Sequence, residues 1–170
     1  MNFFSDKSVI LHKKYLENLN LRCSALLKSS PEVIGMSLDK MRKKRFLNKP
    51  DIIALRSEII CHEIFFSSFG KSYEASCAVK KKYRTEQSFL YELYRLGLER
   101  RGEFLGIFVN RGEVSVKISD CERLLTYGKP ILAVDLCEHA YFMDYGFSKG
   151  EYLRNILSYL NLGKLDENSQ

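Results

Sequence analysis

The stretch Asp135-Leu-Cys-Glu-His-Ala-Tyr-Phe-Met-Asp-Tyr145 places a carboxylate and an imidazole four residues apart. It follows Pro-Ile-Leu-Ala-Val at residues 130–134, an apolar run that predicts a buried strand ending on Asp135. Aspartate and histidine at this spacing suit a hard or borderline metal ion. The same pair also arises by chance, and a histidine that is hydrogen-bonded within the core is the alternative interpretation. The stretch therefore predicts a strand that ends on a possible metal ligand. A metal site would need further ligands from other parts of the chain.

The chain has only three histidines in 170 residues, and the other two, His12 and His62, fall in helical patterns. Apolar residues cover most of the circumference of the helix expected over residues 50–67, so His62 is expected inside the protein. All three histidines thus fall in stretches that could contribute to one dispersed metal site.

The hydrophobic pattern changes along the chain from a helical period to a strand period. Asn110-Arg-Gly-Glu113 between two apolar segments is typical of a hairpin turn. An all-helical first half and a second half with a small antiparallel sheet flanked by helices are therefore expected. Helices are predicted over residues 8–28, 37–45, 50–67 and 85–98, and strands over residues 104–109, 114–118 and 131–136.

Asp135-x-x-Glu138-His139-Ala-Tyr141 followed by Asp144-Tyr145 resembles the C-terminal signature of the iron/manganese superoxide dismutases. His12-Lys-Lys-Tyr15 and Cys61-His62-Glu-Ile-Phe-Phe66 resemble the first and second helices of that family in the same order. The resemblance extends from about residue 12 to residue 162. It implies an α+β fold with a helical-hairpin domain over residues 1–83 and an α/β domain with a three-stranded antiparallel sheet over residues 84–170.

The resemblance also implies iron or manganese as the cofactor and superoxide as the substrate. His62, Asp135 and His139 match three of the four metal ligands of the family, and Tyr15 matches the tyrosine above the open coordination position. This set of two histidines and one carboxylate suits iron, manganese or zinc with open coordination positions. The fourth ligand is a histidine eight residues before that tyrosine, where this chain has Lys7. On this alignment the fourth ligand is missing.

Further departures from the family pattern surround the expected site. Leu11 takes the place of a pocket histidine, and His12 corresponds to a neighbouring histidine that is not a ligand. The chain has no tryptophan, and Cys137 replaces one of those that line the pocket in the family. The glutamine that contacts metal-bound solvent aligns with Glu58 or Glu99.

Three side chains are candidates for the missing ligand. Glu58 and His62 are one helical turn apart and share a face, so the carboxylate could complete the set. A solvated or salt-bridged Glu58 is the alternative. Cys61 and Cys137 could act as soft ligands, although small buried cysteines are common core residues, and the five cysteines show no paired spacing.

Because one of the four ligands of the family is missing on this alignment, we predict a metal-binding protein whose superoxide dismutation is weak or lost. A non-catalytic dimeric scaffold, for example a subunit of a ribonucleoprotein, is the alternative, and a zinc or iron site with other chemistry is a third. By resemblance the chain forms a homodimer in which Glu138 bonds His139 of the partner across a twofold axis. Phe142 lacks the hydroxyl that supports this contact in the family.

The net charge is +6, with basic runs at residues 40–45 and 80–84. Such runs usually lie on solvated helix ends, and aromatic residues at helical spacing do not form a stacking platform, so nucleic-acid binding is the less favoured interpretation. No segment is long and apolar enough to cross a membrane. The first residues lack a secretory or transit pattern, which predicts a cytoplasmic protein.

Overall fold

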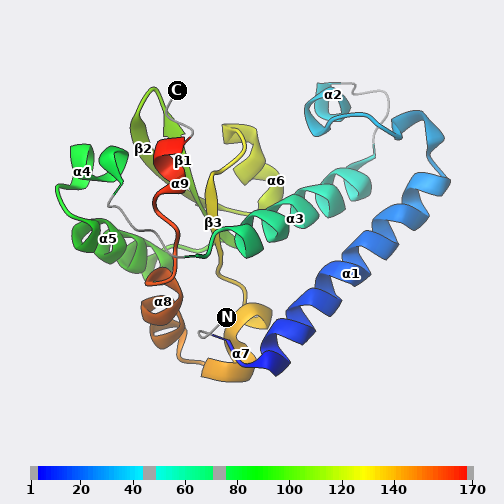
Figure 1. Cartoon of the computed structure of the whole chain (residues 1–170). Coiled ribbons are helices and arrows are strands. Elements are labelled where there is room, and N and C mark those ends of the chain that lie inside the picture. Colours follow the sequence, from blue (N-terminus) through cyan, green and yellow to red (C-terminus); the bar gives the residue numbers. More distant parts are fainter. Residues whose placement is uncertain (1–3, 44–48, 71–75, 168–170) are drawn as a thin grey trace.

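The structure is a computed structural model that describes residues 4–43, 49–70 and 76–167. Its first part is built on two long helices, α1 (Asp6–Lys28) and α3 (Pro50–Ser67), which pack as an antiparallel hairpin (Figure 1). A proline in the first turn begins α3, where its missing N–H is not needed. The short helices η1 (Pro31–Val33) and α2 (Leu38–Lys43) connect the two.

The second part combines a sheet with short helices. After α4 (Cys77–Tyr83) and α5 (Glu86–Glu99) the chain forms a hairpin of β1 (Phe104–Asn110) and β2 (Glu113–Ser119). The remaining elements are α6 (Cys121–Leu124), η3 (Leu125–Tyr127), β3 (Leu132–Asp135), α7 (Glu138–Tyr145), α8 (Lys149–Leu157) and α9 (Lys164–Glu167).

The sheet has the strand order β2-β1-β3 and is antiparallel throughout. Arg111 and Gly112 form the hairpin turn with φ angles of 50° and 73°. Two positive φ angles are the requirement of a type I′ turn, which matches the twist of the paired strands. In the register of β1 with β3, Phe104 lies opposite Asp135. The sheet thus holds the aspartate at the end of its edge strand.

Helices flank both sides of the sheet, with α3 and α6 on one side and α4 and α5 on the other, while α8 packs against α5 (Figure 1). The approach of α6 depends on Gly106, because a Cβ atom there would meet the Leu124 side chain at 3.1 Å. The ring of Phe104 lies 5.2 Å from the ring of His62, centroid to centroid. The half of α3 that carries His62 is therefore packed against the sheet.

Ser68 joins the end of α3 to β3. Its hydroxyl donates to the carbonyl oxygen of Ile64 at 2.7 Å and accepts the N–H of Ala133 at 2.8 Å. All three residues are buried, where a hydrogen bond between polar groups avoids the cost of leaving them unpaired. This link fixes the second half of α3 relative to the strand that ends on Asp135.

The predicted fold class is confirmed, with a helical N-terminal region and a three-stranded antiparallel sheet in the second part. The helix expected over residues 37–45 is observed as α2, while Lys44 and Arg45 lie outside the described residues. The proposed domain boundary after residue 83 falls between α4 and α5, and the division into two domains stays a prediction. Within the described ranges, every helix is too short or too polar to span a bilayer.

Candidate metal centre

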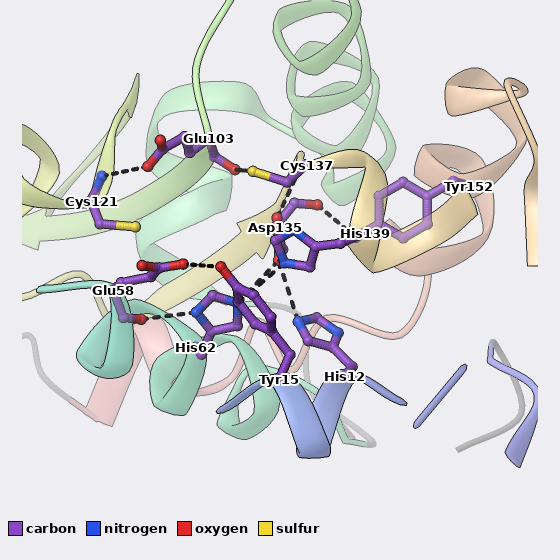
Figure 2. A network of polar contacts seen from close by, with 10 residues as sticks. All are labelled: His12, Tyr15, Glu58, His62, Glu103, Cys121, Asp135, Cys137, His139 and Tyr152. Carbon is purple, nitrogen blue, oxygen red and sulfur yellow. Dashed lines mark hydrogen bonds and ion pairs between the residues drawn. The ribbon is translucent and has the colours of Figure 1, made fainter. Parts of the chain in front are cut away.

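Four side chains from four separate elements converge at one point in the interior (Figure 2). His12 comes from α1, His62 from α3, Asp135 from the end of β3 and His139 from the first turn of α7. One donor atom from each residue lies within 4.8 Å of all the others. All three histidines of the chain are therefore gathered around a single carboxylate.

Asp135 lies at the centre of this cluster and is fully buried. Its Oδ2 atom is 3.0 Å from His139 Nε2, 3.3 Å from His12 Nε2 and 3.5 Å from His62 Nε2. Its Oδ1 atom accepts the backbone N–H of Cys137 at 2.8 Å, and its carbonyl oxygen accepts the Tyr152 hydroxyl at 2.7 Å. The aspartate is thus fixed with one oxygen directed at three imidazoles.

His62 is held by the backbone of its own helix. Its Nδ1 atom donates to the carbonyl oxygen of Glu58 at 2.8 Å, which leaves the Nε2 lone pair of the neutral ring facing the cluster. Burial lowers the pKa of His62, and the nearby Asp135 carboxylate opposes this only in part. The ring is therefore prepared as a neutral nitrogen donor.

His139 is the cluster member in contact with solvent, with 34% of its side chain exposed against 3% for His12 and none for His62. Burial alone would lower the pKa of His139, but the Asp135 carboxylate outweighs it and raises that pKa. Burial likewise favours the neutral form of Asp135, yet His12 and His139 hold the pKa of this carboxyl below its ordinary value. The cluster thus keeps an anion at its centre.

The cluster contains buried polar atoms without a hydrogen-bond partner. Asp135 Oδ2 and both ring nitrogens of His12 have no hydrogen-bond partner, although Oδ2 lies 3.0 Å from His139 Nε2 and 3.3 Å from His12 Nε2. An unpaired buried polar group costs about 1–3 kcal/mol, so such atoms call for an explanation. A cation bound among them would satisfy these atoms. Three imidazole nitrogens and one carboxylate oxygen are a donor set that fits iron or manganese.

Tyr15 and Glu58 form a second layer beside the donors. The Tyr15 hydroxyl donates to the Glu58 carboxylate, and the Tyr15 ring lies 4.5 Å from the His139 ring, centroid to centroid (Figure 2). Burial and the Glu58 carboxylate together raise the pKa of Tyr15 above its ordinary value. Glu58 therefore contacts the site twice, through its carbonyl oxygen to His62 and through its carboxylate to Tyr15.

The alignment puts Lys7 at the fourth ligand position and leaves His12 outside the ligand set, but in the structure His12 is the residue of α1 that lies among the candidate donors. Lys7 is exposed in the first turn and Leu11 is 43% exposed, whereas His12 is buried in the cluster. The reason is the register of the helix. Its buried residues are Ser8, His12, Leu19 and Cys23. Residues four apart share a face, so this spacing was the signal in the sequence that could have placed His12 inside.

The other candidates for a fourth donor lie outside the cluster. Among the described residues, the group of convergent donors does not include Glu58, Cys61 or Cys137. Cys61 is fully buried, and Cys137 is half-buried with its N–H bonded to Asp135. Of the two carboxylates at the glutamine position, Glu58 lies beside the site, whereas Glu99 pairs with Arg95 on the surface. Tyr152, which holds the Asp135 carbonyl, is a further contact that sequence reasoning missed.

Comparison with known proteins agrees with this geometry. Residues 71–168 match the family model described as iron/manganese superoxide dismutases, C-terminal domain. The chain is also 28% identical over 116 residues to the superoxide dismutase [Fe] of Cupriavidus metallidurans, covering 63% of this chain and 58% of that protein. It thus spans less than two thirds of the length of this relative. Because the family match extends over more than half of its length, the chain belongs to the iron/manganese superoxide dismutase family.

Proposed function

We propose that the protein binds one iron or manganese ion through His12, His62, Asp135 and His139. The observation that carries this proposal is the buried Asp135 oxygen, which has no hydrogen-bond partner and faces three imidazoles. Four protein donors remove the main reason for expecting an incomplete site. Zinc would fit the same donors, so the identity of the metal is a separate question.

We further propose slow dismutation of superoxide as the activity. A bound iron or manganese ion would supply the one-electron oxidation and reduction that convert superoxide into oxygen and peroxide. Forming peroxide also consumes protons, and Tyr15 is the hydroxyl that lies against the His139 ring. Its proton is directed at Glu58, and its pKa is raised. A donor held in this way transfers its proton reluctantly, which supports weak turnover.

Elemental analysis of the purified protein, combined with a superoxide assay, tests both proposals. We expect about one iron or manganese ion per chain, and turnover that disappears when the metal is removed by a chelator and returns when it is restored. Metal-free, inactive protein would contradict the metal centre. Stoichiometric zinc without turnover would favour a site with other chemistry, because zinc does not change its oxidation state.

A homodimer is proposed from the surface beside the metal centre. Phe142, Met143 and Phe147 are 45%, 49% and 86% exposed around the C-terminal end of α7. Clustered exposed apolar side chains commonly mark an interaction surface. Glu138 and the partly exposed His139 lie in the first turn of the same helix, where a contact across a twofold axis would bring together Glu138 of one protomer and His139 of its partner.

Sedimentation of the wild type, Glu138→Ala and Phe147→Ser tests this association. Both variants are expected to shift the protein toward the monomer, the second more strongly because it removes apolar area. Tyr91→Ser is the matched control, since Tyr91 is an exposed aromatic residue on α5. A monomeric wild type would contradict the proposal.

The same surface would serve a non-catalytic dimeric scaffold, which stays the second candidate function. The basic run in α4 does not favour nucleic-acid binding. One of its lysines, Lys82, donates a hydrogen bond to the carbonyl oxygen of Val114, so its ammonium group is used within the protein. A cytoplasmic location also stays a prediction. The superoxide assay separates the scaffold from the enzyme.

A further inference from the structure

The two helices that carry His12 and His139 are joined by a pair of hydrogen bonds between Ser5 and Asp144. Asp144 Oδ1 accepts the Ser5 hydroxyl at 2.6 Å, and Oδ2 accepts the backbone N–H of Ser5 at 2.9 Å. Ser5 is the N-cap of α1, and its Oγ also accepts the N–H of Ser8 at 3.2 Å. One aspartate of α7 therefore holds the residue from which α1 begins.

Asp144 is poorly placed for its own helix and well placed for α1. A carboxylate near the C-terminal end of α7 lies at the negative end of that helix dipole, which is unfavourable. At the N-terminus of α1 the same charge meets the positive end of a dipole. Partial burial alone would raise the pKa of Asp144, but the hydrogen bonds from Ser5 outweigh it and lower that pKa. The carboxylate thus stabilises the junction between the helices.

This junction matters because, among the described residues, the only polar contact of the His12 ring is the 3.3 Å approach of its Nε2 atom to Asp135 Oδ2. Both its ring nitrogens lack a hydrogen-bond partner, and the ring packs against those of Phe65 and Phe66 at centroid distances of 5.1 and 5.0 Å. Aromatic packing tolerates sliding along the helix axis more readily than a hydrogen bond does. The position of His12 therefore depends on where α1 is docked.

Resting on the metal centre proposed above, we infer that Asp144 is a positioning residue for that centre. By holding Ser5, it fixes the N-terminal turns of α1 against α7 and so sets the separation of His12 from His139. Ser8 and His12 follow Ser5 along the same part of the helix, and both are buried. Releasing the junction would let His12 move away from the other three donors.

The chain contains a matched control for this junction. Asp166 of α9 accepts the Ser76 hydroxyl at 3.0 Å and the N–H groups of Cys77 and Ala78 at 2.8 and 3.0 Å. It therefore caps the N-terminus of α4 from a distant segment, as Asp144 does for α1. No residue of α4 belongs to the donor cluster. Asp166→Ala removes a cap of the same kind without touching the metal centre.

The first measurement is a Co²⁺ titration of the metal-free full-length chain, followed by visible absorption. Asp144→Ala should weaken Co²⁺ binding about tenfold or more, the range seen when outer contacts of metal ligands are lost, and should change the absorption bands of the bound ion. Asp144→Asn keeps one acceptor oxygen and should give an intermediate effect. Asp166→Ala should lower the melting temperature by a similar amount but leave binding and spectrum unchanged.

The second measurement does not need a metal. The chain has only three histidines, so a ¹H–¹⁵N spectrum of the imidazole rings in the metal-free protein reports on this cluster alone. Asp144→Ala should shift the His12 signals, and Asp166→Ala should not. If the wild type binds Co²⁺ and Asp144→Ala matches it in affinity and spectrum, the positioning role is overturned while the metal centre survives. If no metal binds but the His12 signals shift only in Asp144→Ala, the metal centre fails and the positioning role survives.

Discussion

His62 and Asp135 are held in a different way from His12 and His139, although all four side chains meet at one point. The first pair lies on elements of the core and is oriented by backbone groups, the Glu58 carbonyl and the Cys137 N–H. The second pair lies on α1 and α7, outside the sheet layers. A buried hydrogen bond to the backbone forms whenever the fold forms, whereas the docking of a peripheral helix can change while the core stays intact.

The candidate metal centre thus has a core pair, His62 and Asp135, whose positions are set by the core, and a peripheral pair, His12 and His139, whose positions also require that α1 and α7 are docked. Substitutions that remove each pair test this difference.

Asp135→Asn should abolish metal binding, because it removes the only anionic donor from the cluster. In the metal-free protein it should also cost about 3 kcal/mol of unfolding free energy, since the buried imidazoles lose their charged partner. Elemental analysis and urea unfolding measure the two effects. Asp120→Asn is the control, because this exposed residue caps α6 and asparagine caps helices equally well. Retention of stoichiometric metal in Asp135→Asn would contradict its central role.

His12→Ala should weaken metal binding by more than about 100-fold, which exceeds the usual effect of losing an outer contact. The core pair and His139 would still offer three donors, so residual binding is expected. Lys7→Ala should leave the affinity unchanged, because this side chain is exposed. Competition with a chelator of known affinity measures both variants. Equal affinities for the two would show that His12 is not a donor.

Glu58→Gln should leave metal content unchanged, because the bond to His62 comes from the backbone of residue 58. It should lower the pKa of Tyr15 toward its ordinary value by removing the carboxylate, and raise dismutation about tenfold if Tyr15 then delivers protons. Tyrosine absorbance against pH and a superoxide assay measure these changes. Glu63→Gln, an exposed change on the same helix, is the control. A loss of metal in Glu58→Gln alone would instead make the carboxylate a ligand.

The smallest effect concerns the pH dependence of the junction between Ser5 and Asp144. The pKa of Asp144 is lowered in the folded protein, so its contribution to stability is present above the ordinary value of 3.8. It is lost as the pH falls through the lower folded-state pKa. The stability difference between wild type and Asp144→Ala, at most about 1 kcal/mol for such an exposed pair, should therefore shrink in acid. Urea unfolding at pH 6 and pH 3 measures it, and a constant difference would contradict the assignment.

Most of the fold could be predicted because its signals are local. The Asn110-Arg-Gly-Glu113 turn fixes the hairpin, and the apolar run before Asp135 identifies β3. The helix α4 was not predicted. Its sequence is short and strongly basic, and its N-terminus is capped by Asp166, a residue almost ninety positions away. No local pattern contains such a contact.

Three of the four donors of the candidate site could also be predicted from the sequence. His62, Asp135 and His139 were recognised because each lies in a motif whose spacing resembles that of the family, and the structure brings them together. The place of His12 was missed because the alignment counted residues back from Tyr15 instead of following the buried face of α1, which Ser8, His12, Leu19 and Cys23 form. The contact between Ser5 and Asp144, which are 139 positions apart in the sequence, could only be seen in three dimensions.

The partial exposure of His139 has a consequence for how quickly a metal could be exchanged. The other three donors are enclosed by protein, so an incoming ion or a competing chelator must approach past this one imidazole. Rotation of a single side chain would then open the route, and any partner covering α7 would close it. In the cell, the lifetime of the bound ion would therefore depend on whether that surface is covered, even if the affinity of the centre never changed.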